Sequence, residues 1–169
     1  AFGSAPFETH NIAKLNLTAR VRFGQKYFSY PDSKFTVPND HYPTVFLSYE
    51  KGFASSVDAY NYDQLQLRLA QGFNIANKGN FQYNLKAGKL FNANDIAFTD
   101  YQHFNGNQTR IGTSSNYLNV FNNLPYYELS TNNQYLEFHA EHDFKGYVLG
   151  KIPLLNKLNY NLVIGAHTL

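Results

Sequence analysis

The sequence contains no cysteine among its 169 residues, which excludes disulfide bonds and thiolate metal sites. It also contains no run of the roughly 18 consecutive apolar residues that a transmembrane helix requires. Charged residues make up only 15% of the chain, and the net charge of +2 comes without a basic cluster. The sequence therefore gives no indication of a nucleic-acid partner or of binding to an anionic membrane surface.

Apolar and aromatic side chains are plentiful but are dispersed among polar ones. Hydrophobic residues reach 43% and aromatic residues 17%, yet the mean hydropathy is negative. Strands with one apolar face and one polar face give this combination in a transmembrane β-barrel. A soluble all-β domain gives it as well, so composition alone leaves both open.

Period-two alternation of apolar and polar residues dominates the chain and predicts β-strands. The clearest example begins at Ala13, and it is long enough to cross a bilayer as a tilted strand, which takes about 9–11 residues. A helix over the same residues would scatter its charges around the whole circumference. Residues 126–129 are a candidate extension of one strand. The six predicted strands cover residues 13–23, 44–50, 64–75, 81–87, 136–144 and 159–166.

The connections between these strands differ in length. Residues 77–80 form a short, turn-like hairpin connection. Residues 24–43 form a longer polar loop with three prolines, and residues 91–124 form a still longer one, rich in Asn, Thr, Ser and Gly. Bacterial barrels have short turns on one side and long loops on the other, so we expect the two long loops to lie opposite the short turn.

Aromatic residues gather near the ends of the predicted strands. Rings with an apolar body and a polar edge favour the membrane–water interface, where barrels carry aromatic girdles. Ordinary strand-end aromatics of a soluble barrel are the alternative. The residues are Tyr27, Phe28, Tyr30, Tyr42, Tyr60, Tyr62, Tyr126, Tyr127 and Tyr135.

The polar face of the strands would line the lumen if the apolar face meets lipid. Basic and acidic walls of one barrel can then pair across the interior. The simplest interpretation is that these charges line a wet interior, and the alternatives are a ligand path or a latch for an inserted loop. The predicted lumen-facing residues are Lys14, Arg20, Arg22, Arg68 and Lys86 in the first part, and Glu137, His139, Glu141 and Asp143 in a later strand.

No pattern in the sequence predicts a cofactor, a metal or catalysis. In the stretch His139-Ala140-Glu141-His142, strand alternation places His139 and Glu141 on one face and His142 on the other. Zinc-binding motifs of similar spacing place their ligands on a helix. The sequence shows no nucleophile elbow, phosphate loop or paired-carboxylate motif, so we predict a protein that is not an enzyme.

Three stretches occur in the order found in a known family. They are residues 41–44 running into 47–52, residues 100–109, and residues 135–158 with Lys151-Ile152-Pro153. Together they resemble the Bacteroidota family of large outer-membrane proteins of unknown function, whose members carry an N-terminal carboxypeptidase-regulatory-like domain before a C-terminal barrel. The resemblance covers essentially the whole chain. It implies that residues 1–169 are part of one outer-membrane β-barrel domain, with the N-terminal domain and the closing strands outside this chain.

A weaker resemblance links the long loop and the acidic strand to barrels of the outer-membrane assembly machinery. In those barrels a late loop folds into the lumen, and its arginine meets an acidic wall strand. The resemblance implies that Arg110 is the inserted cation and that Glu137 or Glu141 is its partner. The sequence departs from the tight Arg-Gly-aromatic signature, because Ile111 follows Arg110.

The sequence therefore predicts an antiparallel transmembrane β-barrel segment in the cell outer membrane, in contact with lipid. Three functions fit it. The first is an accessory or structural subunit of an envelope complex, with other envelope proteins as partners. The second is an assembly or translocation barrel for outer-membrane proteins. The third is a soluble β-barrel that binds a small ligand, because the same alternation fits an apolar interior and a wet exterior.

Overall fold

The computed structural model describes residues 9–37, 41–106 and 118–169, and these residues are all-β. They contain no α-helix, and their helical turns are short 3₁₀ segments at Asp58–Tyr60, Ala76–Lys78, Phe98–Asp100, Leu149–Lys151 and Leu155–Leu158. The six long strands are β1 (Ala13–Arg22), β4 (Thr44–Phe53), β5 (Tyr62–Asn74), β6 (Asn80–Phe91), β7 (Gln134–Asp143) and β8 (Val163–Thr168). All six predicted strands are thus confirmed, with shifts of a few residues at their ends.

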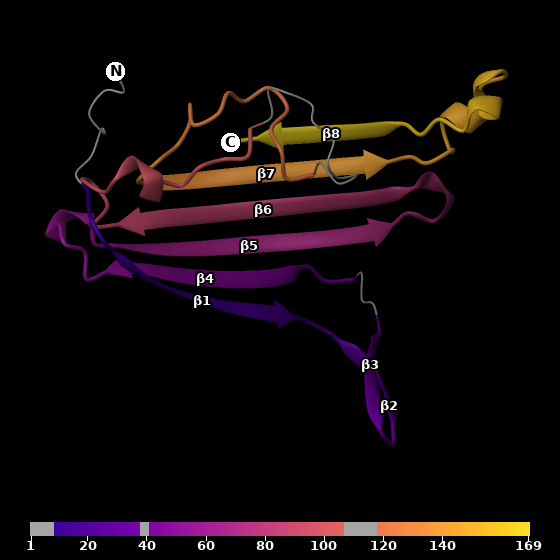
Figure 1. Cartoon of the computed structure of the whole chain (residues 1–169). Helices are drawn as coiled ribbons and strands as arrows, with labels where there is room; N and C mark the ends of the chain where they lie inside the picture. Colours follow the sequence, from indigo (N-terminus) through magenta and orange to yellow (C-terminus); the bar gives the residue numbers. More distant parts are fainter. Residues whose placement is uncertain (1–8, 38–40, 107–117) are drawn as a thin grey trace.

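These six strands form one antiparallel sheet in the order β1-β4-β5-β6-β7-β8 (Figure 1). Within the described residues, β1 and β8 are each paired on one side only, so the sheet is open and not closed into a barrel. The predicted antiparallel arrangement is confirmed. The predicted closure of the sheet into a transmembrane barrel stays a prediction.

A separate two-stranded sheet lies within the segment that the sequence predicted to be a loop. It consists of β2 (Lys26–Tyr30) and β3 (Ser33–Val37), and it projects beyond the end of β1 (Figure 1). The prediction of a loop throughout residues 24–43 was therefore wrong. Its prolines and acidic residues concealed two short alternating stretches, in which Phe28 pairs with Phe35 across the hairpin.

Short and long connections are not sorted to opposite ends of the sheet. Adjacent antiparallel strands force successive connections to alternate ends. The short connection 75–79 therefore shares its end with the long connections 23–43 and 144–162, whereas 54–61 and 92–133 lie at the other end (Figure 1). The prediction of short turns on one side and long loops on the other was wrong for this reason.

The strand register brings the polar positions of five strands into one row across the sheet. Arg20 lies opposite Phe46, Phe46 opposite Arg68, Arg68 opposite Lys86, and Lys86 opposite Glu137. Directly opposed residues of antiparallel strands point to the same side, so this row defines one face, called the polar face below. The other side is called the apolar face, and its leucines are Leu15, Leu17, Leu47, Leu65, Leu67, Leu69, Leu85 and Leu136.

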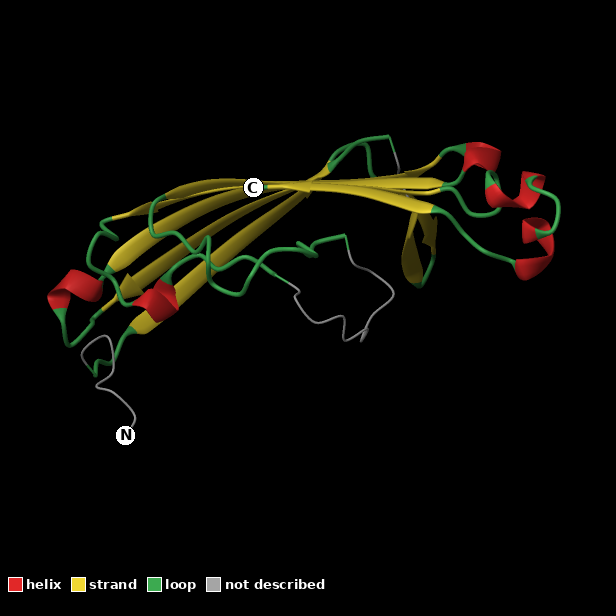
Figure 2. Ribbon diagram, turned by 90° about the horizontal axis from the view of Figure 1, so that it is seen from above, coloured by secondary structure: helices red, strands yellow, loops and turns green. Residues whose placement is uncertain are grey.

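The described parts of the connection between β6 and β7, residues 92–106 and 118–133, fold back over the polar face, on the concave side of the arched sheet (Figure 2). Residues 126–129 lie in this connection and form turns, so their prediction as a strand extension was wrong. The buried core therefore sits between the connection and the polar face, and not on the apolar face. It consists of Tyr62, Leu90, Ala93, Ile96, Phe104, Phe121 and Tyr135.

Candidate functional site

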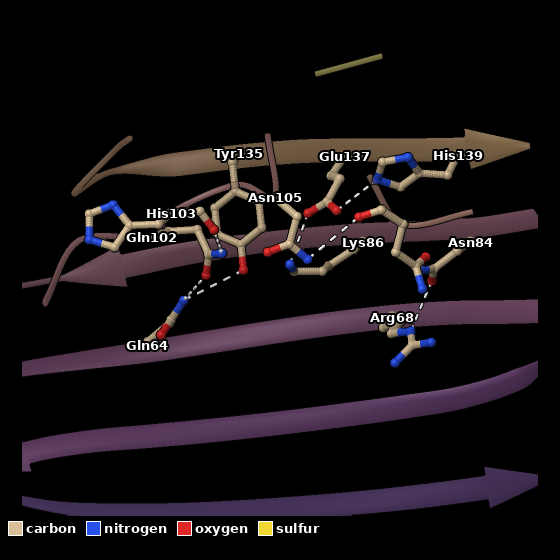
Figure 3. A network of polar contacts seen from close by, with 11 residues as sticks. Gln64, Arg68, Asn84, Lys86, Gln102, His103, Asn105, Tyr135, Glu137 and His139 are labelled. Carbon is tan, nitrogen blue, oxygen red and sulfur yellow. Dashed lines mark hydrogen bonds and ion pairs between the residues drawn. The ribbon is translucent and has the colours of Figure 1, made fainter. Parts of the chain in front are cut away.

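A chain of polar side chains crosses β6, β7 and β8 under the connection, and its two middle members, Glu137 and His139, are buried. The Glu137 carboxylate lies 2.8 Å from the Lys86 ammonium through Oε2 and 2.8 Å from His139 Nε2 through Oε1 (Figure 3). His139 is 0% exposed. A buried carboxylate is costly unless hydrogen-bonded cationic or donor groups face it. Glu137 has one such group beside each oxygen, so these three residues form one interlocked unit.

His139 extends this unit to the edge strand. Its Nδ1 lies 2.8 Å from Nδ1 of His167 on β8. The carboxylate of Glu137 accepts from His139 Nε2–H, and the ring tautomers decide which histidine donates across the Nδ1–Nδ1 contact. The Phe121 ring covers the pair at 4.5 Å from the His139 ring centroid. The polar chain Lys86–Glu137–His139–His167 therefore ties three strands together, and Phe121 of the connection covers its two histidines.

Amide side chains join the connection to the middle of the sheet. Arg68 donates through Nε to Asn84 Oδ1 at 2.9 Å, and Asn84 donates through Nδ2 to Asn119 Oδ1 at 2.6 Å. Closer to the core, Gln64 donates to Gln102 Oε1 at 3.1 Å (Figure 3). The connection thus has fixed polar attachments at two places on the polar face.

Ionic and aromatic contacts reinforce these attachments. Lys14 on β1 forms an ion pair with Asp100 of the connection. The Phe104 ring packs edge-to-face on Tyr135 at a centroid distance of 5.5 Å. Such aromatic pairs add about 0.5–1.5 kcal/mol beyond the area they bury. The described parts of the connection, residues 92–106 and 118–133, are therefore packed against the polar face.

A cavity of about 310 Å³ remains between the connection and the centre of the polar face. Its walls are hydroxyl, amide and charged groups, with one aromatic ring. It is called the central cavity below. Its lining residues are Thr18, Phe46, Ser48, Gln66, Arg68, Asn84, Lys86, Asn105, Asn119 and Glu137.

The predicted basic residues share the polar face, but they do different things there. Lys86 pairs with Glu137, and Lys14 pairs with Asp100. Arg20 and Arg68 lie on either side of the Phe46 ring, at 5.2 and 5.1 Å from its centroid. The remaining basic residue, Arg22, lies opposite Thr44 at the end of β1.

The predicted acidic partners are only partly brought together. Glu137 contacts Lys86 and His139. Glu141 lies four residues further along β7, opposite Gln82 of β6. Asp143, at the end of β7, lies opposite Asn80. Arg110 lies outside the described residues, so its predicted contact with Glu137 or Glu141 stays a prediction.

Several site residues were not identified from the sequence. His167 lies one residue past the predicted end of the last strand, although extending the alternation beyond Ala166 would have placed it on the polar face. Asn119 and Phe121 lie in the long connection, where no periodicity indicates which side chains turn toward the sheet. Asp100, the partner of Lys14, escaped notice for the same reason.

Metal binding and helical membrane crossing have no support in the part of the chain that is described. Those residues bring no three His, Cys, Asp or Glu side chains together in a way that could hold a metal ion. None of the helical segments in the described ranges has the length and apolar character to span a membrane.

One comparison with known proteins gives a match. The model of the DUF5686 C-terminal domain, from a family of unknown function, matches residues 1–169. No curated protein matches the chain, and no solved structure does.

Proposed function

The chain belongs to the DUF5686 C-terminal domain family, a family of unknown function, and we propose that it forms part of the wall of a β-barrel in the outer membrane of a Gram-negative-type cell. The apolar face meets lipid, and the polar face lines the lumen. The connection 92–133 fills part of that lumen. Our proposed role is an accessory or structural subunit of an envelope complex, without enzymatic activity.

The exposure of the apolar face carries this proposal. Leu17, Leu67 and Leu136, on three different strands, are 57%, 43% and 58% exposed. Contiguous apolar surface of this kind is rare on soluble monomers and marks a membrane or protein contact. Burying apolar surface yields roughly 25 cal/mol per Å², so a folded sheet in water would bury this face before its polar one. Here the chain's own connection covers the polar face instead.

The distribution of charge on the apolar face supports lipid as the covering medium. Among its described strand residues, Lys51, Asp63 and Lys89 are the Asp, Glu, Lys or Arg residues, and all lie toward one end of the sheet. Phe53 and Phe91 lie at the same end. An apolar band bordered by charged and aromatic residues is the pattern of lipid-facing barrel walls.

The opposite border of the band is aromatic too. Phe73, Phe81 and Tyr83 lie on the apolar face near the 75–79 turn, and the rings of Phe73 and Phe81 are 5.3 Å apart. Between Leu65 and Phe73 the apolar face of β5 extends roughly 27 Å at about 3.4 Å per residue. A lipid-facing band is about 25 Å tall, so this stretch matches one only when it stands nearly upright. The whole of β5 (Tyr62–Asn74), at roughly 41 Å, still rises about 29 Å when it is tilted by 45°.

The packed connection favours a structural role over an open pore. Amide hydrogen bonds, an ion pair and two core phenylalanines hold it against the polar face. A wide channel would need this surface to be free. In the proposed barrel the connection acts as an internal brace that occupies lumenal space.

A second candidate, an outer-membrane assembly or translocation barrel, is favoured by the same connection. A long loop folded over an acidic wall strand is the feature expected of it. Against it, Glu137 already has Lys86 and His139 as partners. The soluble ligand-binding barrel is less well supported, because its apolar residues would point toward the concave, covered side of the sheet.

Fractionation of cells that express the full-length protein tests the proposal. We expect recovery in the outer-membrane fraction, resistance to alkaline carbonate extraction, and release by mild detergent. Recovery in the soluble periplasmic fraction would overturn the membrane location. For the role, we expect purification in mild detergent to yield a defined complex with other envelope proteins; co-purification with assembly machinery or unfolded barrels would favour the second candidate.

A further inference from the structure

We propose that the central cavity binds a small anion that carries hydroxyl groups, such as a sugar acid or a sugar phosphate, with Arg68 as its main anchor. This inference goes beyond the proposed function. It rests on the polar face alone, so it does not depend on the medium that covers the apolar face.

The charge of the cavity floor is the first argument. The charged groups that line the cavity are the cations of Arg68 and Lys86 and one carboxylate, that of Glu137. Arg20 lies in the same row across the polar face but does not line the cavity. Glu137 pairs with Lys86, and within the described ranges no carboxylate lies within ion-pair distance of Arg20 or Arg68. The floor therefore has an excess of positive charge that an anion would neutralise.

The geometry of Arg68 is the second argument. The guanidinium carbon of Arg68 lies over the Phe46 ring, 5.1 Å from the ring centroid. Its Nε–H donates to Asn84 Oδ1 at 2.9 Å. These two contacts fix the plane of the group. Its two terminal amino groups make no hydrogen bond to the described residues, and Arg68 lines the cavity. A guanidinium held in this way presents two parallel donors, which suit the two oxygens of a carboxylate or phosphate.

The neutral lining of the cavity indicates a hydroxylated ligand. Thr18 and Ser48 supply hydroxyls on one side, and Asn105 and Asn119 supply amides on the other. Groups that both donate and accept match ligand hydroxyls, which do the same. The volume of about 310 Å³ is at the lower end of the roughly 300–1,000 Å³ of small-molecule sites. The cavity therefore fits a compact polar molecule and not a polymer.

Titration calorimetry on the detergent-purified full-length protein tests this inference, with glucuronate, glucose 6-phosphate and glucose as probes. We expect saturable binding of glucuronate or glucose 6-phosphate at millimolar concentration or below, and much weaker binding of glucose. The anion that binds more tightly indicates whether the cavity is suited to a carboxylate or to a phosphate. Absence of saturable binding by both anions, or equally tight binding of glucose, would overturn the proposal. Acetate and inorganic phosphate that bind as tightly as the sugar anions would overturn the role of the hydroxyls.

Two variants assign the binding to the cavity. Arg68→Gln removes the anchoring charge, and we expect it to weaken binding about tenfold or more, since hydrogen bonds to charged groups are the strong ones. Ser48→Leu narrows the cavity at a half-exposed position and is expected to weaken binding without altering the fold. Lys157→Gln, an exposed cation in the 144–162 connection, is the matched control. Unchanged affinity in both cavity variants would contradict the assignment.

Discussion

Tyrosine rings lie directly over glycines at two places on the polar face. Gly88 is opposite Tyr135, and a Cβ placed on Gly88 would come within 2.3 Å of that ring. Gly52 is opposite Tyr62, with a corresponding distance of 2.7 Å. Contacts this short do not occur, so neither ring could keep its position over an alanine. Both tyrosines belong to the core under the connection.

Gly88→Ala is therefore expected to loosen the covering connection. The added methyl displaces Tyr135, which then loses its edge-to-face contact with Phe104. Overpacking of this kind costs about 1–3 kcal/mol. Limited proteolysis should cut residues 92–133 faster in the variant than in the parent. Gly150→Ala is the control, because a Cβ there meets nothing within 4 Å. Equal cleavage of both variants would mean that the absence of a side chain at Gly88 is not needed to hold Tyr135 and the connection in place.

A second prediction at the scale of residues concerns the polar chain Lys86–Glu137–His139–His167. Glu137→Leu leaves Lys86 and His139 without their shared acceptor, and breaking a buried pair in this way costs about 3–5 kcal/mol. Adding Lys86→Met should recover part of the loss, because it removes the uncompensated cation. Urea unfolding of both single variants and the double variant measures the coupling. Strictly additive losses would mean that Lys86 and Glu137 do not act as a pair.

The sequence predicts on which face of the sheet a strand residue lies, but it does not predict which residue of the neighbouring strand it contacts. Alternation alone assigned Lys86, Glu137 and His139 to one face, because the period of a strand is two. Their mutual contacts depend on the register between β6 and β7, which alternation within each strand leaves open. The arginine–carboxylate pair that resemblance implied involves Arg110, outside the described residues, and it stays a prediction.

At the scale of elements, the six long strands were predictable because each presents a sustained alternation. The hairpin β2–β3 was missed, since its strands have five residues each and a proline follows each of them directly. The folded state of the connection 92–133 was missed as well. Its contacts with the sheet join residues far apart in the chain, such as Lys14 and Asp100, and local sequence patterns carry no information on such pairs.

Releasing this connection is expected to open the polar face. Phe104→Ala combined with Phe121→Ala removes two buried rings, each worth about 3–5 kcal/mol in a packed core. Single-channel recording in planar bilayers should then show larger and more frequent openings than in the parent protein. Tyr126→Ala, at a 57% exposed position of the same connection, is the control. Unchanged conductance in the double variant would mean that the connection does not occupy a lumen.

At the scale of the whole molecule, the open edges of the sheet determine what the proposed location requires. In a bilayer each unpaired backbone group costs several kcal/mol, so spanning sheets have no free edge. Strands β1 and β8 would then pair with further strands, in this protein or in a neighbouring one. In the barrel that we propose, the described sheet would be one arc.

Hydrogen exchange of the full-length protein in detergent measures this pairing. We expect the amides of β1 to be protected along the whole strand, as those of β4 are between two neighbours. A free edge would leave every second amide of β1 facing solvent, because antiparallel pairing engages alternate residues. Rapid exchange at alternate positions of β1 would therefore contradict closure.

The most direct test of a lipid-facing apolar face is the free energy of unfolding of Leu67→Lys, measured in lipid vesicles beside its neighbour Gln66→Lys. Leu67 lies on the apolar face and is 43% exposed, whereas Gln66 lies on the polar face. Contact with lipid predicts a loss of about 2–4 kcal/mol for Leu67→Lys, the cost of a lysine near the bilayer midplane, and little change for Gln66→Lys. A loss within about 0.5 kcal/mol for both, as at a solvated surface, would contradict contact between this face and lipid.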